Sequence, residues 1–213
     1  MGMPGSGKGT QAQMLARDIE YKQFSTGNAF RQIALEDSDF GREVKRVMES
    51  GLLTSPAMAT EVVIGATKEL VENGEGIVFD GTPRTLEEAK SINEKFIEQG
   101  YGVPLVIYLE VDKNTMIERN SKRRLCLNID TEFPVTSEKD EERCASLGGK
   151  VGTRPDDEKE KFTTRYNQFM ELTYPAIALQ KELHPELYFT VDGMDVPHRV
   201  HASVMDVIGK FEI

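Results

Sequence analysis

The stretch GMPGSGKGT, residues 2–10, decides the fold, and an amphipathic helical pattern follows it directly. Glycines allow backbone conformations that turn successive N–H groups inward, and a helix N-terminus adds unsatisfied donors and a partial positive charge. Lys8 contributes a full charge, and Thr10 offers a hydroxyl to a metal ion. A plain glycine turn would leave this lysine unfavourably placed without an anion. The stretch therefore predicts a phosphate-binding P-loop, and the insertion of Gly9 before Thr10 indicates a subset of such proteins.

Short apolar runs alternate with helical patterns along the rest of the chain. The strand-like runs cover residues 77–79, 105–109 and 187–191. The helical patterns cover residues 8–20, 39–50, 56–72, 85–99, 113–122, 155–183 and 197–210. This alternation predicts a parallel sheet with helices on both faces. Between Leu125 and Val151 the sequence becomes polar and rich in turn residues, so we expect a small inserted lobe or flap there.

Composition restricts the class of protein. The chain has 213 residues, enough for one well-buried core with small lobes inserted into it. Its formal net charge of −10 opposes binding to nucleic acid or anionic lipid. No apolar stretch approaches the roughly 20 residues that span a bilayer, and no secretory signal follows Met1, so we expect a cytoplasmic protein. Two cysteines fit a reducing compartment.

Three further segments, in this order, resemble the adenylate kinase family together with the P-loop variant: FSTGNAFR at 24–31, FDGTPRT at 79–85 and VDG at 191–193. Four arginines, Arg119, Arg123, Arg154 and Arg165, stand at family-like spacing. The resemblance covers essentially the whole chain. It implies an α/β, three-layer P-loop kinase fold with a parallel sheet, which reversibly transfers a phosphoryl group from ATP to AMP and gives two ADP.

The resemblance also implies an arrangement of three parts. The core domain would comprise residues 1–24, 55–118 and 156–213, with a helical nucleoside monophosphate-binding lobe at 25–54 and a flap (LID) lobe at 119–155. Closure of the lobes would assemble the site and keep water away from the transferring group. The partners expected are ATP with Mg²⁺ and a nucleoside monophosphate, with AMP favoured, and the protein is expected to be a monomer.

Residue roles follow from the same resemblance. ATP would be bound by Gly5, Ser6, Gly7, Lys8, Gly9, Thr10, Arg119, Arg123, Phe133 and Asp195. The acceptor would be bound by Thr26, Arg31, Leu52, Leu53, Thr54, Gly81, Thr82, Pro83, Arg84, Glu88, Arg154 and Arg165. Catalysis would depend on the cations Lys8, Arg84, Arg123, Arg154 and Arg165, because negative charge builds up on the equatorial oxygens of the transferring group. Asp80, at the end of an apolar run, would hold Mg²⁺ through water.

Two departures from the family concern structure. The family has a buried strand before the P-loop, whereas only Met1 precedes Gly2 here, so we expect the sheet to lack its central strand and the natural protein to begin upstream. Cys126 and Cys144 stand where some members have the first cysteine of each C-x-x-C zinc pair. Two thiolates cannot complete a tetrahedral site, so structural zinc is not expected. The two cysteines could lie close in space, and a disulfide between them is possible in principle, but a reducing compartment disfavours it.

A third departure concerns the acceptor. Glu88 stands where the family usually has the Gln that reads the acceptor base, and an ionised carboxylate only accepts hydrogen bonds. Guanine presents two neighbouring donors, so Glu88 weakens the case for AMP and opens one for GMP, unless it points to solvent; AMP stays the favoured acceptor because the other acceptor positions resemble the family. Asn28 and Thr82 also differ from the family residues. The alternatives to AMP transfer are therefore a kinase for GMP or another acceptor, and a non-catalytic nucleotide-binding relative. The lack of an Asn-Lys-x-Asp motif disfavours a GTPase.

Overall fold

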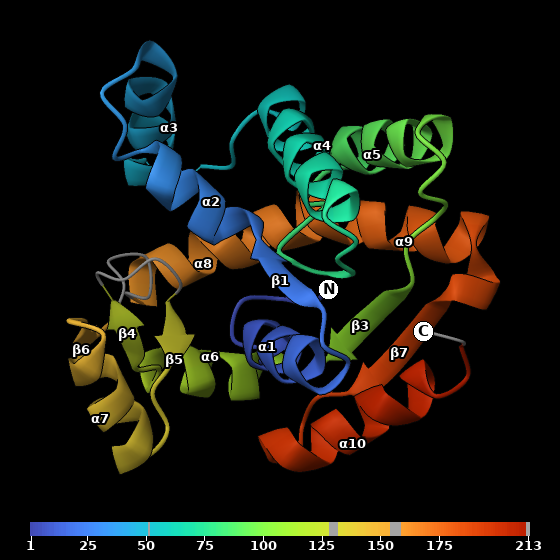
Figure 1. Cartoon of the computed structure of the whole chain (residues 1–213). Helices are drawn as coiled ribbons and strands as arrows, with labels where there is room; N and C mark the ends of the chain where they lie inside the picture. The colour runs from blue at the N-terminus through green and yellow to red at the C-terminus, as the bar shows by residue number, and fades with distance from the viewer. Residues whose placement is uncertain (51, 128–131, 154–158, 212–213) are drawn as a thin grey trace.

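The structure is a computed structural model that describes residues 1–50, 52–127, 132–153 and 159–211. It has the predicted α/β architecture, built on two pairs of parallel strands (Figure 1). Strand β1 (Lys22–Ser25) pairs with β2 (Ile77–Asp80), and β3 (Val106–Glu110) pairs with β7 (Tyr188–Asp192). The flap holds a further antiparallel sheet in the order β5 (Phe133–Pro134), β4 (Leu125–Leu127), β6 (Lys150–Gly152).

The helices are α1 (Lys8–Asp18), α2 (Thr26–Ile33), α3 (Asp39–Glu49), α4 (Pro56–Glu72), α5 (Leu86–Glu98), α6 (Lys113–Ser121), α7 (Glu138–Ser146), α8 (Lys159–Gln168), α9 (Tyr174–Leu183) and α10 (Pro197–Ile208). A π-helical turn, η2 (Phe169–Thr173), joins α8 to α9, and a 3-10 turn, η3 (Pro185–Leu187), precedes β7. Within the described residues, no helix is long and apolar enough to cross a lipid bilayer.

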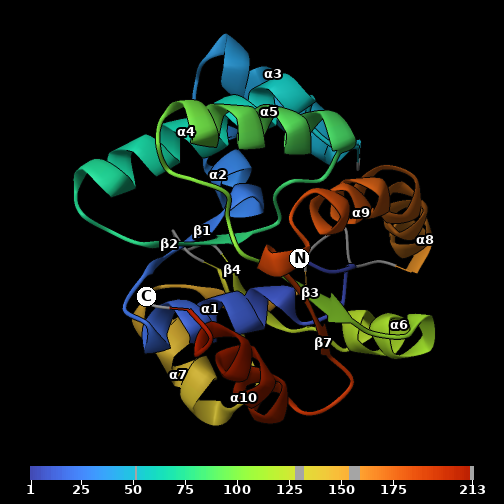
Figure 2. The same ribbon diagram turned by 90° about the vertical axis from the view of Figure 1, so that its right-hand side faces the viewer.

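Helices cover the strands from two sides and complete three layers (Figure 2). On one side, Leu15 of α1 and Val204 of α10 pack with Leu109 and Val191 of the strands. On the other side, α4 and α5 pack on β1 and β2, and α9 packs on β3. The three-layer arrangement was predicted from the alternation of strands and helices, and it is confirmed.

Sequence reasoning missed strand β1 and helix α2, did not divide the flap into α7 and its strands, and joined α8 to α9. Strand β1 and helix α2 were not predicted, because the four residues of β1 (KQFS) are too few and too polar to show an apolar run. The helix predicted over 155–183 is interrupted at η2. Pro175 explains this interruption, because it has no N–H to donate and its ring crowds the carbonyl four residues earlier.

A cavity separates the two strand pairs. Among the described residues, no strand lies between β2 and β3; the nearest substitute is an isolated parallel bridge from Gly2 to Leu109. The amino group of Met1 donates to the Ile107 carbonyl at 2.5 Å, and Leu109 N–H donates to the Met1 carbonyl at 2.9 Å. The cavity has a volume of about 600 Å³, and its lining includes Val63, Val78, Phe79, Phe96, Ile107, Leu109 and Val204. It could hold an extended apolar segment.

The flap has its own small core. Cys126 of β4 and Cys144 of α7 are fully buried and packed with Phe133, Val135 and Val151. They form a disulfide, with their Cα atoms 5.5 Å apart. The prediction that this pair is not disulfide-bonded is wrong, because the flap brings the two cysteines to the separation that a disulfide requires. Neither sulfur is then available as a thiolate ligand for zinc.

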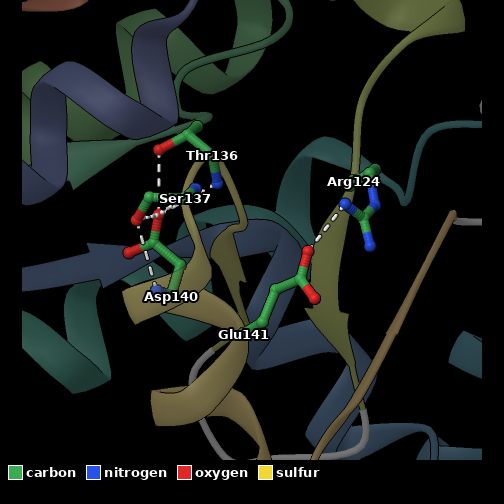
Figure 3. Close-up of polar contacts among 5 residues, drawn as sticks. All are labelled: Arg124, Thr136, Ser137, Asp140 and Glu141. Atoms are coloured by element: carbon green, nitrogen blue, oxygen red, sulfur yellow. Dashed lines mark hydrogen bonds and ion pairs between the residues drawn. The ribbon is translucent and has the colours of Figure 1, made fainter.

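Polar contacts hold the flap helix against its sheet (Figure 3). Oδ2 of Asp140 accepts hydrogen bonds from the backbone N–H and hydroxyl groups of both Thr136 and Ser137, at 2.9–3.0 Å. The bond from the Thr136 N–H is the main cause that lowers the pKa of Asp140. Ser137 and Asp140 form the capping box of α7, and Arg124 pairs with Glu141 at 2.8 Å. These contacts fix how α7 begins.

The cavity leads to a prediction about stability. Joining an apolar, valine- and isoleucine-rich segment of about five residues to Met1 should fill the space between β2 and β3 and extend the pairing that Met1 makes with β3. Each side chain buried there contributes about 1.5–3 kcal/mol, so we expect Tm to rise by more than about 5 °C in calorimetry. A Gly/Ser segment of equal length is the control. Equal Tm values for the two fusions would contradict this account of the cavity.

The disulfide leads to a second prediction. Replacing Cys126 and Cys144 together by Ala should destabilise the flap by about 3 kcal/mol, because the disulfide closes a loop of 18 residues. Hydrogen exchange should become faster between Leu125 and Gly152 while the strand pairs of the core stay protected. A reductant should act on the native chain in the same way and leave the double variant unchanged. Unaltered exchange in the flap after reduction would refute the stabilising role.

Candidate active site

The P-loop residues form a tight turn that ends in the first turn of α1. Gly5 and Gly7 have φ angles of +84° and +88°, a region that favours glycine. A Cβ at Gly5 would lie 2.6 Å from the carbonyl oxygen of Met116, so a larger residue would displace α6. The Ser6 N–H donates to the Met3 carbonyl at 3.1 Å, which closes the turn. The turn and the helix N-terminus together form a site for an anion.

Lys8 lies within a group of positive charges. Its side chain is half-buried, and its ammonium group donates to the Met3 carbonyl at 3.4 Å. Burial lowers the pKa of Lys8 to about 8, the carboxylate of Asp80 raises it in part, and three arginines lower it further. These are, in order of effect, Arg165, Arg84 and Arg123. Four of the predicted catalytic cations, Lys8 and these three arginines, therefore lie close enough to interact electrostatically. The fifth, Arg154, lies outside the described residues.

Asp80 ends strand β2 beside this group. Its Oδ1 atom is buried and accepts no hydrogen bond among the described residues, and a Cβ at Gly9 would lie 3.2 Å from its Oδ2. The hydroxyl of Ser6 is also buried without a described partner. A free carboxylate oxygen next to a phosphate cradle fits Mg²⁺, which keeps several waters and needs few protein ligands. Thr10, half-buried in the first turn of α1, is the nearby hydroxyl predicted for the same task.

The loop after β7 holds Arg119. The guanidinium of Arg119 donates to the carbonyl groups of Gly193, Met194 and Asp195 at 2.7, 2.9 and 3.2 Å. Gly193 packs closely there, since a Cβ would lie 2.7 Å from Val111 and 3.5 Å from the Ser6 carbonyl oxygen. Arg119 and Asp195, both predicted for ATP, are thus joined in one arrangement beside the P-loop. The guanidinium plane is fixed and can stack on a flat ring.

Phe133, which is predicted to bind ATP, lies in the core of the flap. Its side chain is 2% exposed, and the guanidinium of Arg143 covers its ring at 4.5 Å. The ring fills the core of the flap next to the disulfide, because this lobe has few apolar residues with which to build a core. The predicted contact between this side chain and nucleotide stays a prediction.

A second pocket faces the P-loop from α2. A Cβ at Gly27 would lie 3.5 Å from a terminal nitrogen of Arg31 and 3.6 Å from one of Arg84, so two guanidinium groups meet above Gly27. The pocket is lined by Thr26, Phe30, Leu53, Thr54, Ala59, Gly81, Arg84, Thr85 and Glu88. It combines apolar walls with polar groups and a cation, the chemistry that a base carrying a phosphate requires, and its volume in this structure is about 10 Å³.

Arg84 is held in place from several directions. Its Nε donates to the Gly81 carbonyl at 2.7 Å, and its own carbonyl accepts from the Thr173 hydroxyl at 2.8 Å. Its backbone N–H donates to Glu88 at 2.9 Å. These contacts fix the arginine, which lines the second pocket and also lowers the pKa of Lys8, before any ligand binds.

The remaining predicted acceptor residues divide into two groups. Thr26, Leu53, Thr54, Gly81 and Glu88 line the pocket. Leu52, 59% exposed, is not part of the pocket lining, and Thr82 and Pro83 instead line the large cavity between the strand pairs.

Sequence reasoning did not select several residues that the fold brings to this site. Phe30 lies within the segment 24–31 that resembles the family, and its aromatic side chain could have indicated a contact with a base. Ala59 and Thr85 carried no chemical signal, because they line the pocket through packing alone. Glu132 of the flap pairs with Arg31 at 3.3 Å, with exposures of 13% and 28% for the two side chains. This contact joins residues about 100 positions apart and could not be read from spacing.

Comparisons with known proteins agree with this geometry. The family model described as adenylate kinase matches residues 1–184. A curated adenylate kinase of Fervidobacterium nodosum is 31% identical over 214 residues, covering 100% of this chain and 97% of the relative. Adenylate kinases of Thermosipho africanus and Bacillus subtilis are each 32% identical, over 99% and 98% of this chain and 98% and 96% of their own lengths. The family model and these relatives cover most or all of the chain, so the chain belongs to the adenylate kinase family.

Proposed function

We propose that the protein transfers the terminal phosphoryl group of ATP to AMP and gives two ADP. One observation carries the proposal: Arg84 lines the acceptor pocket and also acts electrostatically on Lys8 of the P-loop. A cation shared by the two sites is what transfer between two bound phosphates requires. The relatives are described as adenylate kinases, which supports AMP as the acceptor.

The cations would act by holding charge in place. The P-loop N–H groups and Lys8 bind the outer phosphates of ATP, and Arg31 and Arg84 bind the phosphate of AMP through the fork of donors that arginine offers. Arg123 and Arg165, which also act on Lys8, stabilise the charge that develops on the transferring group. An ionised phosphate needs no proton removed before it attacks, so the site works without a general base.

Mg²⁺ would neutralise part of the phosphate charge and orient the phosphates. Asp80 would hold it through water, as its unpartnered Oδ1 allows, with the Thr10 hydroxyl beside it. On the base side of ATP, the fixed plane of Arg119 supplies a stacking surface.

The two lobes would divide the work. Segment 25–54 would carry the acceptor; its α2 and α3 form a small cluster through Phe30 and Val44 with α4. Segment 119–155 would cover the phosphates, and its separate core is tied by the disulfide. The remainder would form the core domain. A cover of this kind is needed because water in place of AMP would hydrolyse ATP.

A lysine variant tests the proposal. Lys8→Met should reduce ADP formation from ATP and AMP by at least about 100-fold, because it removes a preorganised charge from the transition state. Because burial disfavours the Lys8 cation, the Tm of the free variant should not fall, and ATP should no longer raise it. The control is Lys90→Met, at an exposed position on α5. Undiminished transfer by Lys8→Met would refute the proposed function.

The Arg31–Glu132 pair leads to a further prediction. The Glu132 carboxylate occupies Arg31, so it competes with the AMP phosphate. Glu132→Gln should lower the KM for AMP by about three- to tenfold, the range expected for loss of a partly buried ion pair, and leave the KM for ATP unchanged. Glu138→Gln, at an exposed flap position, is the control. A higher KM for AMP would show instead that the pair orients Arg31 for binding.

A further inference from the structure

A buried carboxyl group lies in the wall of the acceptor pocket. Glu88 is only 2% exposed. Its Oε1 accepts from the Thr82 hydroxyl at 2.5 Å, and its Oε2 accepts from the Arg84 N–H at 2.9 Å. The position of α5 is set by the Thr85 side chain, which accepts from the Glu88 N–H at 3.1 Å. The carboxyl group is therefore fixed in the pocket, and the alternative that it points to solvent is excluded.

The pocket combines apolar walls with polar side chains. Phe30, Leu53 and Ala59 supply apolar walls for a flat ring. The hydroxyl of Thr26 is buried without a partner among the described residues, so it can donate to a ligand or accept from it. Each oxygen of Glu88 already accepts one hydrogen bond from the protein and has a second lone pair for a base. Thr26 and Glu88, with Thr54 and Thr85, are the uncharged or carboxyl polar groups of the lining that can meet the edge of a base.

The protonation state of Glu88 decides which purine edge it matches. An ionised carboxylate accepts from two donors, and guanine presents two neighbouring donors, its ring N1–H and its 2-amino group. Adenine instead presents a donor, its 6-amino group, beside an acceptor, its ring N1. A protonated carboxyl group matches adenine, because its carbonyl oxygen accepts from the amino group and its O–H donates to N1. An ionised one would leave N1 facing an oxygen lone pair, a mismatch in a buried site.

We propose that Glu88 binds AMP with its carboxyl group protonated, so that one proton taken up from solvent selects adenine over guanine. The inference rests on the proposed function and adds the residue that determines acceptor specificity. The proton binds to a Glu88 oxygen as AMP enters and returns to solvent after ADP leaves, so the overall reaction is unchanged.

The charges around Glu88 agree with this role. Burial raises the pKa of its carboxyl group, and the Thr82 hydroxyl, the Arg84 N–H, the Arg84 charge and the Thr85 contact oppose this rise only in part. Helices α2 and α4 contribute Thr26, Phe30 and Ala59 to the pocket wall, which are uncharged. Arg31 of α2, above Gly27, is the other cation of this region, and Glu87 on the same helix as Glu88 is exposed.

The test compares two acceptors across pH. The ratio of kcat/KM for AMP to that for GMP is measured from about pH 6 to about pH 8, so that the phosphate ionisation, common to both nucleotides, cancels. In the native chain the ratio should fall as pH rises, by up to about tenfold per pH unit above the pKa of Glu88. Glu88→Gln should have a higher ratio that does not change with pH, since an amide always offers one donor and one acceptor. Glu87→Gln, the same change at the exposed neighbour, should behave as the native chain.

Other outcomes would overturn the inference. A flat ratio in the native chain, or the same slope in Glu88→Gln, would exclude proton-coupled selection. An equal loss of kcat for both acceptors in Glu88→Gln, with an unchanged pH dependence, would show that Glu88 only positions Arg84. If the native chain phosphorylates neither nucleotide, the proposed function itself is wrong. If Glu88→Gln has a low Tm, Thr82→Val is used in its place. This change removes the hydroxyl that stabilises the carboxylate, so the ratio of AMP to GMP should begin to fall at a higher pH than in the native chain. A fall at the same pH in both proteins would refute the proposal.

Discussion

Positive charge held close together in a partly buried site is the constraint on which the rest of this structure depends. Lys8 has a pKa lowered to about 8 because burial and three arginines disfavour its cation, and only Asp80 offsets them. Such a group is unfavourable in the free protein and becomes favourable when phosphates enter. Repulsion among these cations costs stability in the free protein, and bound phosphates relieve that repulsion. The whole chain has a net charge of −10, so the positive charge at this site attracts phosphates locally while the rest of the surface repels polyanions.

The fold supplies the means of holding that charge. Parallel strands direct their carboxyl ends to one edge, so Ser25 before α2 lies opposite Asp80 before the Arg84 loop, and Glu110 lies opposite Asp192 before the loop that binds Arg119. Short contacts then fix each cation: the carbonyl groups of residues 193–195 hold Arg119, and Gly81, Thr173 and Glu88 hold Arg84. Preorganisation of this kind lowers the cost of ordering side chains when a ligand binds.

The parts of the molecule that sequence reasoning reached are those governed by local chemistry. The glycines of the P-loop, the apolar runs of β2, β3 and β7 and the helical patterns each have a cause within a few residues. Strand β1 could not be predicted in this way, because its residues are polar and few and its partner strand is 55 positions away. The disulfide was not predicted for a different reason. The expected reducing compartment disfavoured it, whereas the flap sheet and α7 bring the two cysteines together.

The sequence by itself determined which chemistry is present: a phosphate cradle, a set of arginines at characteristic positions, and an alternation of strands and helices that can support them. Only the tertiary structure decided which of these groups meet. It placed Phe133 inside the flap, paired Arg31 with Glu132, left a cavity between two strand pairs and buried Glu88 beside the acceptor pocket. The physical reason is that local conformation follows from neighbouring residues, whereas burial, desolvation and ion pairing depend on segments that are distant in the chain and meet only after folding.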